Sequence, residues 1–133
     1  MYGHNLSGGH GDDWIWGSSM DDDIYGDHLS GANETFFGDD HLYGAGGDDT
    51  IFGNTGNDII KGGEGIDTID GGENDDVIWG DAGADLIDTG YGLDTVFGGA
   101  DCDQVKTYGG GDVIWLGECT AEELVTASPD SDF

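Results

Sequence analysis

The sequence predicts an all-β fold, a flat parallel β-roll built from about six two-strand coils. Three observations support this prediction. A unit of nine residues repeats twelve times in one phase, from Gly8 to Trp115. Glycine and aspartate dominate its first six positions, a composition typical of turns. An aliphatic residue stands at its eighth position between two outward neighbours, which is the alternation of a strand.

The repeat is clearest between Gly44 and Asp70, where three copies read GAGGDDTIF, GNTGNDIIK and GGEGIDTID. Among the twelve copies, the sixth position is Asp in eleven, the eighth is Ile, Leu or Val in eleven, and the fourth is Gly in eight. The third copy is degenerate, because Gly31 replaces the Asp and Asn33 replaces the aliphatic residue. Three columns kept in phase over 108 residues indicate a solenoid.

Each predicted strand has only three residues, so it needs partners from stacked coils. With two nonads per coil, the core becomes two facing rows of aliphatic residues, with neighbouring coils about 4.8 Å apart. This core is thin, so another interaction must stabilise the fold. We expect a lead-in over residues 1–7, the roll over 8–115, and a cap and tail over 116–133. Thr120 and Glu123 resemble a capping box, which predicts one helical turn over AEELV at the open end.

Charge narrows the choice of partners. The 133 residues include 30 acidic ones, two lysines and no arginine, for a formal net charge of -28. Such a chain lacks the basic footprint that nucleic acid requires, and it would be repelled by anionic membranes. We expect no membrane insertion and no cleaved signal peptide, because MYGHNLSGG has neither a basic nor an apolar region. The self-repulsion requires neutralising cations.

The repeat resembles the RTX (repeats-in-toxin) family of calcium-binding nonapeptides, the serralysin and hemolysin type, whose signature is G-G-x-G-x-D-x-U-x. Two segments match it letter for letter, Gly8 to Ile15 and Gly62 to Ile69. The resemblance covers about four fifths of the chain. It implies a right-handed parallel β-roll with Ca²⁺ between turns of successive coils. The ligands would be sixth-position carboxylates and backbone carbonyls.

Calcium chemistry agrees with this resemblance, because Ca²⁺ takes six to eight hard oxygen ligands. The predicted metal ligands are the eleven sixth-position aspartates: Asp13, Asp22, Asp40, Asp49, Asp58, Asp67, Asp76, Asp85, Asp94, Asp103 and Asp112. The alternative is that these residues only terminate turns. Mg²⁺ is disfavoured because it demands octahedral geometry and keeps its waters. Zinc is disfavoured because Cys and His are few and scattered.

Alternate nonads share an edge of the roll, so each Asp should pair with the one eighteen residues away. One edge would carry Asp22, Asp40, Asp58, Asp76, Asp94 and Asp112. The other would carry Asp13, a gap at Gly31, and then Asp49, Asp67, Asp85 and Asp103. This arrangement predicts about eight sites with both carboxylates. Met20 weakens the prediction for the Asp22–Asp40 pair, since it replaces the turn glycine.

The ninth position is aromatic in seven of twelve copies. Sorting the copies by parity puts one set on a single face and Trp14 and Trp16 on the other; the set is Tyr25, Tyr43, Trp79, Phe97 and Trp115. An apolar stripe of this extent indicates an interface, with a second copy, a flanking domain or a glycan as the candidate partner. The alternative is cross-strand packing that only stabilises the sheet.

Cys102 and Cys119 fall in turns one coil apart, so both a disulfide and two free thiols remain open.

No H-E-x-x-H or G-x-S-x-G motif is present, and we predict no enzyme. The predicted function is a calcium-binding module of a secreted or cell-surface protein that folds on binding Ca²⁺. The alternative is an adhesion or self-assembly module that acts through the aromatic face. Ice binding would need a Thr and Asn array, and only Asn54 to Asn57 resembles one.

Overall fold

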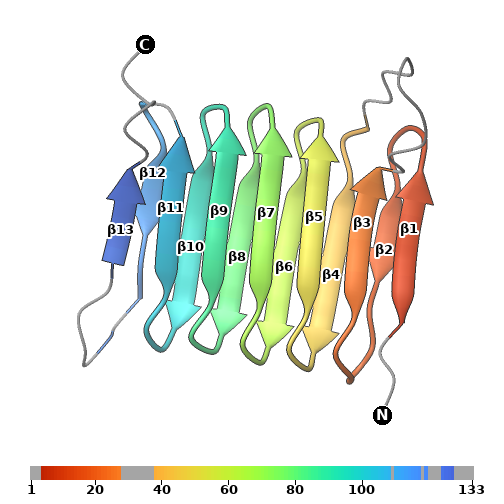
Figure 1. Ribbon diagram of the computed structural model, residues 1–133, viewed down its shortest axis with the longest axis horizontal. Coiled ribbons are helices and arrows are strands. Elements are labelled where there is room, and N and C mark those ends of the chain that lie inside the picture. The colour runs from red at the N-terminus through yellow and green to blue at the C-terminus, as the bar shows by residue number, and fades with distance from the viewer. Residues whose placement is uncertain (1–3, 28–37, 109, 118, 120–123, 128–133) are drawn as a thin grey trace.

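The computed structural model describes residues 4–27, 38–108, 110–117 and 119, and the backbone of 124–127. Over these residues the chain forms thirteen β-strands and no helix. The strands build two parallel sheets that face each other (Figure 1). The predicted all-β roll of about six coils is confirmed.

Odd-numbered strands form one sheet and even-numbered strands form the other. The seven-stranded sheet contains β1 (Asn5–Gly9), β3 (Asp23–Asp27), β5 (Thr50–Thr55), β7 (Thr68–Glu73), β9 (Leu86–Tyr91), β11 (Gln104–Tyr108) and β13 (Leu124–Ala127). The six-stranded sheet contains β2 (Trp14–Trp16), β4 (His41–Gly46), β6 (Ile59–Glu64), β8 (Val77–Ala82), β10 (Thr95–Ala100) and β12 (Val113–Trp115). We call the turns that follow odd-numbered strands the upper edge, at the top of Figure 1, and the opposite turns the lower edge.

The core is formed by eighth-position residues from both sheets. Its buried members are Ile15, Ile24, Leu42, Ile51, Ile60, Ile69, Ile78, Ile87, Val96 and Val105. Most strands have six residues rather than the predicted three, because pairing continues into the next nonad. Coils approach closely at the fourth position: Gly65 has φ 131°, and a Cβ there would collide with the Gly47 carbonyl. Glycine at this position therefore lets the turns stack.

The first coils depart from the predicted register. Thr50 pairs with Thr68, eighteen residues on, but Trp14 pairs with His41 and Asp23 with Thr50, each 27 residues on. The chain between β3 and β4 therefore holds one nonad more than a coil needs, so the prediction of an uninterrupted ladder is wrong there. The physical reason lies in the degenerate third copy, which lacks both the Asp and the aliphatic residue of a coil. Gly31 and Asn33 lie outside the described residues.

Both ends of the seven-stranded sheet hold additional strands. Asn5, within the expected lead-in, pairs with Asp23 in β3. At the other end Leu124 pairs with Gln104, so the predicted helical turn is wrong for Leu124 and Val125. The remainder of AEELV and the predicted capping box lie outside the described residues. A strand is favoured there because it pairs the exposed backbone groups of β11, which a helical turn would leave unpaired.

Deleting residues 28–36 should leave the roll intact. The deletion joins Asp27 to Phe37 and creates a regular turn, GDFGDD, with Gly at positions one and four and Asp at position six. We expect the far-UV circular dichroism and melting temperature in calcium to match the wild type. Removing Gly80 to Asp88 from a regular coil should instead destabilise the protein, since later strands would change sheets. Loss of β-structure on the first deletion would contradict the register described above.

Candidate metal centre

The sixth-position aspartates line the two edges, each immediately before a strand. The upper edge carries Asp13, Asp40, Asp58, Asp76, Asp94 and Asp112, and the lower edge carries Asp22, Asp49, Asp67, Asp85 and Asp103. Along each edge, the backbone N–H of one Asp donates to Oδ1 of the Asp in the next coil. The nine such bonds measure 2.7 to 3.1 Å. One carboxylate oxygen of each pair thus satisfies a turn amide.

Two predicted pairings are corrected by this register. The Asp13 amide donates to Asp40 Oδ1 at 2.8 Å, and the Asp22 amide donates to Asp49 Oδ1 at 2.7 Å. The predicted Asp22–Asp40 pair is therefore wrong, and Asp13 and Asp22 exchange edges. Neither edge is interrupted over the described residues, so nine neighbouring pairs exist where about eight sites were predicted. The extra nonad between β3 and β4 causes this difference.

The second carboxylate oxygen, Oδ2, is buried without a hydrogen-bond partner along most of both edges. This holds at Asp13, Asp40, Asp49, Asp58, Asp67, Asp76, Asp85, Asp94 and Asp112. A buried anionic oxygen without a partner costs several kcal/mol, so such atoms are rare in proteins. Because the exception repeats along both edges, these oxygens could bind a ligand that carries positive charge.

Backbone carbonyls lie beside the unpaired oxygens. A Cβ on Gly62 would collide with Asp67 Oδ2 and lie 2.8 Å from the Gly80 carbonyl oxygen of the next coil. The same neighbours, a carboxylate Oδ2 and a carbonyl of the next coil, surround the first-position glycine in most other repeats. No three acidic, His or Cys side chains cluster tightly enough to hold a metal in the described chain, so carbonyls must complete any shell. An oxygen-only donor set of this kind fits Ca²⁺.

A second acidic column was missed by the sequence prediction. At the fifth position, exposed Asp and Asn side chains also accept amides from the neighbouring coil, as in Asp48 Oδ1 with the Ile66 amide at 2.8 Å. The column is visible in the sequence as Asp12, Asp21, Asp39, Asp48, Asn57 and Asp75. These fifth-position residues fit the alternative in which an Asp only terminates a turn. Most sixth-position residues do the same with one carboxylate oxygen but leave the other oxygen without a hydrogen bond.

Burial makes the sixth-position carboxylates hard to ionise without a counter-charge. It is the main reason that the pKa rises to about 6 at Asp40, Asp49 and Asp94. The pKa reaches about 7 at Asp58 and Asp85, and about 8 at Asp76, where neighbouring carboxylates add repulsion. In the metal-free roll, the ionised form of these carboxylates is therefore less favourable than in an unfolded chain.

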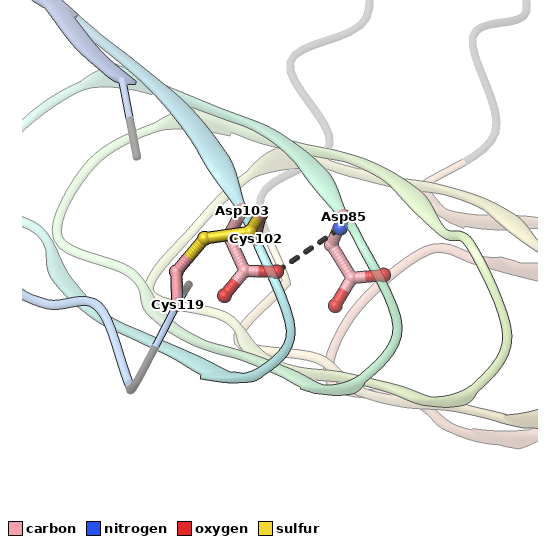
Figure 2. Close-up of a disulfide and its surroundings, with 4 residues drawn as sticks. All are labelled: Asp85, Cys102, Asp103 and Cys119. Atoms are coloured by element: carbon pink, nitrogen blue, oxygen red, sulfur yellow. Dashed lines mark hydrogen bonds between the residues drawn. A yellow bond between two sulfur atoms is a disulfide. The ribbon is translucent and has the colours of Figure 1, made fainter. Parts of the chain in front are cut away.

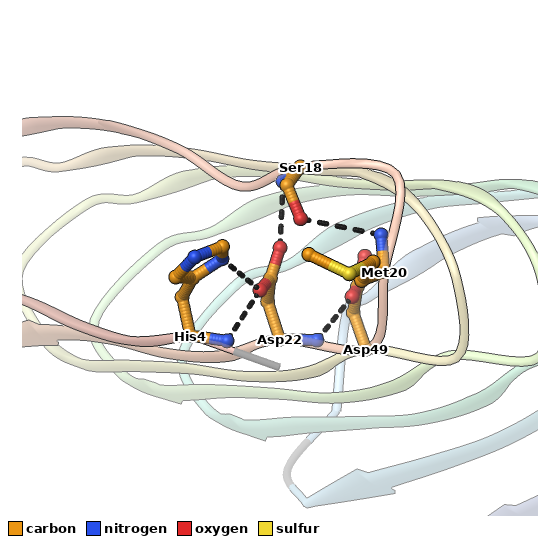
Figure 3. Close-up of polar contacts among 5 residues, drawn as sticks. All are labelled: His4, Ser18, Met20, Asp22 and Asp49. Carbon is orange, nitrogen blue, oxygen red and sulfur yellow. Dashed lines mark hydrogen bonds and ion pairs between the residues drawn. The ribbon is translucent and has the colours of Figure 1, made fainter. Parts of the chain in front are cut away.

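Asp22 differs from the others because protein atoms satisfy both of its oxygens (Figure 3). Its Oδ1 accepts the His4 amide at 2.8 Å, and its Oδ2 accepts the Ser18 amide at 2.6 Å. Burial would raise the pKa of Asp22, but the hydrogen bonds from His4 and Ser18 outweigh it and lower the pKa. His4 occupies the sixth position of the coil before Asp22. Met20 replaces the usual glycine, as noted in the sequence, and its amide donates to Ser18 Oγ at 3.2 Å.

Cys102 and Cys119 form a disulfide beside the last Asp pair of the lower edge (Figure 2). Their Cα atoms are 5.0 Å apart. The bond resolves the two alternatives left open by the sequence. It joins the turn that carries Asp103 to the chain leading into β13, and so ties the terminal strand to the preceding coil.

The aromatic residues follow the corrected register. We define the aromatic row as the ninth-position residues of the six-stranded sheet: Trp16, Tyr43, Lys61, Trp79, Phe97 and Trp115. Neighbouring rings stack, with centroids 5.7 Å apart for Trp16 and Tyr43 and 4.8 Å for Phe97 and Trp115. Tyr25 was predicted here but lies on the other sheet, stacked on Phe52. Trp16 takes its place for the same reason that Asp13 changes edge.

Two acidic, glycine-cradled edges on a parallel solenoid define a metal-binding β-roll. The family model of the RTX calcium-binding nonapeptide repeat (4 copies) matches residues 5–27, 37–60, 52–87, 61–96 and 88–118. These matches span more than half of the chain, which therefore belongs to the RTX calcium-binding repeat family. They omit 28–36, the extra nonad. No curated protein matches the chain.

The raised pKa values predict how pH acts on the metal-free roll. A group whose pKa is higher in the folded than in the unfolded state favours folding only at low pH. That contribution is lost as pH rises from about 4, the unfolded value, through the folded values of about 6 to 8. In chelator, the β-structure seen by circular dichroism should therefore decline between pH 5 and pH 8.5. Saturating calcium should flatten this dependence, and an equally steep decline in calcium would contradict the assignment.

Proposed function

We propose that this RTX module couples its folding to calcium, with the sixth-position aspartates as ligands on both edges. The observation that carries the proposal is the row of buried, unpaired Oδ2 atoms, most of them beside a carbonyl of the next coil. Bound Ca²⁺ would supply the missing charge and draw oxygen atoms from two successive turns. The nine neighbouring Asp pairs set the expected upper range of sites, with Asp22–Asp49 the least available because Asp22 is already hydrogen bonded.

The oxygen donors favour calcium over other metals. Ca²⁺ accepts irregular shells of carboxylates and carbonyls, whereas Mg²⁺ requires a near-octahedral shell. Without the ion, ten buried aliphatic side chains must offset the repulsion within a chain of formal charge -28. The ion therefore acts as part of the folded structure rather than as an accessory to it.

The location that we propose is outside the cell, or on its surface. RTX repeats are typically found in secreted proteins, and a disulfide persists best in an oxidising compartment. A chain that stays unfolded at the low calcium of the cytosol would fold after export. Over the described residues no helix is long and apolar enough to span a membrane. We propose a binding and structural role without catalysis.

A calcium titration tests this proposal. At pH 8 the chain in chelator should give a largely disordered far-UV circular dichroism spectrum, and millimolar Ca²⁺ should convert it to β-structure. Mg²⁺ at the same concentration should not. Asp76→Asn should shift the midpoint to higher calcium, because it removes a charge from two neighbouring pairs. A spectrum that is already fully folded in chelator would overturn calcium-coupled folding.

A second candidate function is self-association through the six-stranded sheet, with a second copy of this chain as the partner. Its outward seventh and ninth positions contain no acidic residue, and Lys61 is their only lysine. Trp14, Trp16 and Trp115 are each more than half exposed. On a chain of this negative charge, the face without acidic residues is where two copies would repel each other least.

Sedimentation velocity in calcium separates self-association from simple cross-strand packing. The wild type should sediment as an oligomer at high protein concentration, and Trp16→Ser combined with Trp115→Ser should return it to a monomer. Tyr91→Ser is the matched control, because Tyr91 is 64% exposed but belongs to the other sheet. A monomeric wild type at all concentrations would rule out the self-association candidate.

A further inference from the structure

One buried carboxylate stands outside both acidic columns. Asp27 occupies the second position of a nonad, where other copies have residues such as Gly63 or Asn54. It ends β3, directly before the extra nonad, and is only 2% exposed. Neither the repeat pattern nor the family signature assigns a role to an acidic residue at this position.

One oxygen of the Asp27 carboxylate is hydrogen bonded and the other is not, as at most sixth-position residues. Its Oδ2 accepts the Thr55 amide at 3.2 Å and the Thr55 hydroxyl at 2.7 Å, both from the next coil. Its Oδ1 is buried and has no hydrogen-bond partner. Since a buried carboxylate oxygen is costly to leave unpaired, the second oxygen favours a positive charge nearby.

The surroundings of Asp27 already contain one pair of the upper edge. The adjacent Gly26 packs against Asp40 Oδ2, and a Cβ there would lie 2.6 Å from the Gly53 carbonyl oxygen. Asp40 Oδ2 and Asp58 Oδ2 are themselves buried and unpaired. Behind the effect of burial, the charge of Asp27 adds to the repulsion that raises the pKa of both Asp40 and Asp58. Three buried carboxylates therefore share one region, where the other pairs have two sixth-position groups.

We propose that Asp27 makes the Asp40–Asp58 step the strongest calcium site of the roll, because its buried negative charge lies beside the oxygen donors of that step. The proposal rests on the calcium function proposed above. A negative charge close to a buried site strengthens the binding of a cation there. Both Thr55 bonds hold Asp27 in place, so its charge stays beside this step. Calcium should then fill this step first.

Asp27→Asn tests the proposal with little change in shape, because the Asn carbonyl oxygen can still accept the Thr55 bonds. Isothermal titration calorimetry and native mass spectrometry, with CaCl₂ as the probe, would measure the affinity and the number of bound ions. We expect the affinity of the first calcium to fall by about tenfold or more, since removing a nearby opposite charge commonly has an effect of this size. The weaker classes of site should keep their affinities.

Asp81→Asn is the matched control. Asp81 also occupies a second position, but it is exposed and lies on the lower edge, where its charge acts on Asp67 and Asp85 rather than on Asp40 and Asp58. The control should keep the affinity of the first calcium. The proposal is overturned if Asp27→Asn keeps it too, or if all sites weaken equally, which would mean a structural role. Failure of the proposed function has a different signature, because the wild type itself would then bind no calcium.

Discussion

The structure depends on one constraint, which is that most turns need a carboxylate that the folded protein cannot neutralise by itself. The amide of a sixth-position Asp is satisfied by Oδ1 of the next Asp, so these side chains cannot be dispensed with. The same geometry buries Oδ2 with no donor in reach. Stacking coils therefore orders the backbone and concentrates negative charge in one step. Any source of positive charge at the edges consequently stabilises the whole roll.

The hydrophobic core cannot relieve this constraint. Each regular nonad contributes one aliphatic residue to the core, so the core has the width of two side chains and grows only in length. Each added coil brings two core residues and also two further carboxylates to the edges. The ratio of buried apolar surface to repulsion between carboxylates thus stays constant however many coils are stacked. A longer roll gains no independence from cations, which explains why the Asp column is as regular as the aliphatic column.

The sequence predicted what is local and missed what is long-range. The Gly, Asp and aliphatic columns each reflect the chemistry of one turn or strand, and the structure places all three as expected. The pairing partners of Asp13 and Asp22 were wrong, because the nine-residue phase is the same whether a weak nonad forms half a coil or lies outside one. Only the pairing of Trp14 with His41 distinguishes these cases. The β13 strand was missed for a similar reason, because its local sequence favours a helix and its pairing with β11 favours a strand.

The corrected register changes the functional picture at the N-terminal coils. On the lower edge, His4 and Ser18 satisfy both oxygens of Asp22, so protein donors take the place that we propose for a cation at the other steps. On the upper edge, the chain leaves the regular coil after Asp27 and adds a buried carboxylate instead. Neighbouring steps of one repeat thus differ in how many carboxylate oxygens the protein itself satisfies. In a repeat that looks uniform in sequence, the few residues that break the pattern can therefore make its metal sites unequal, so that calcium would bind them in a defined order.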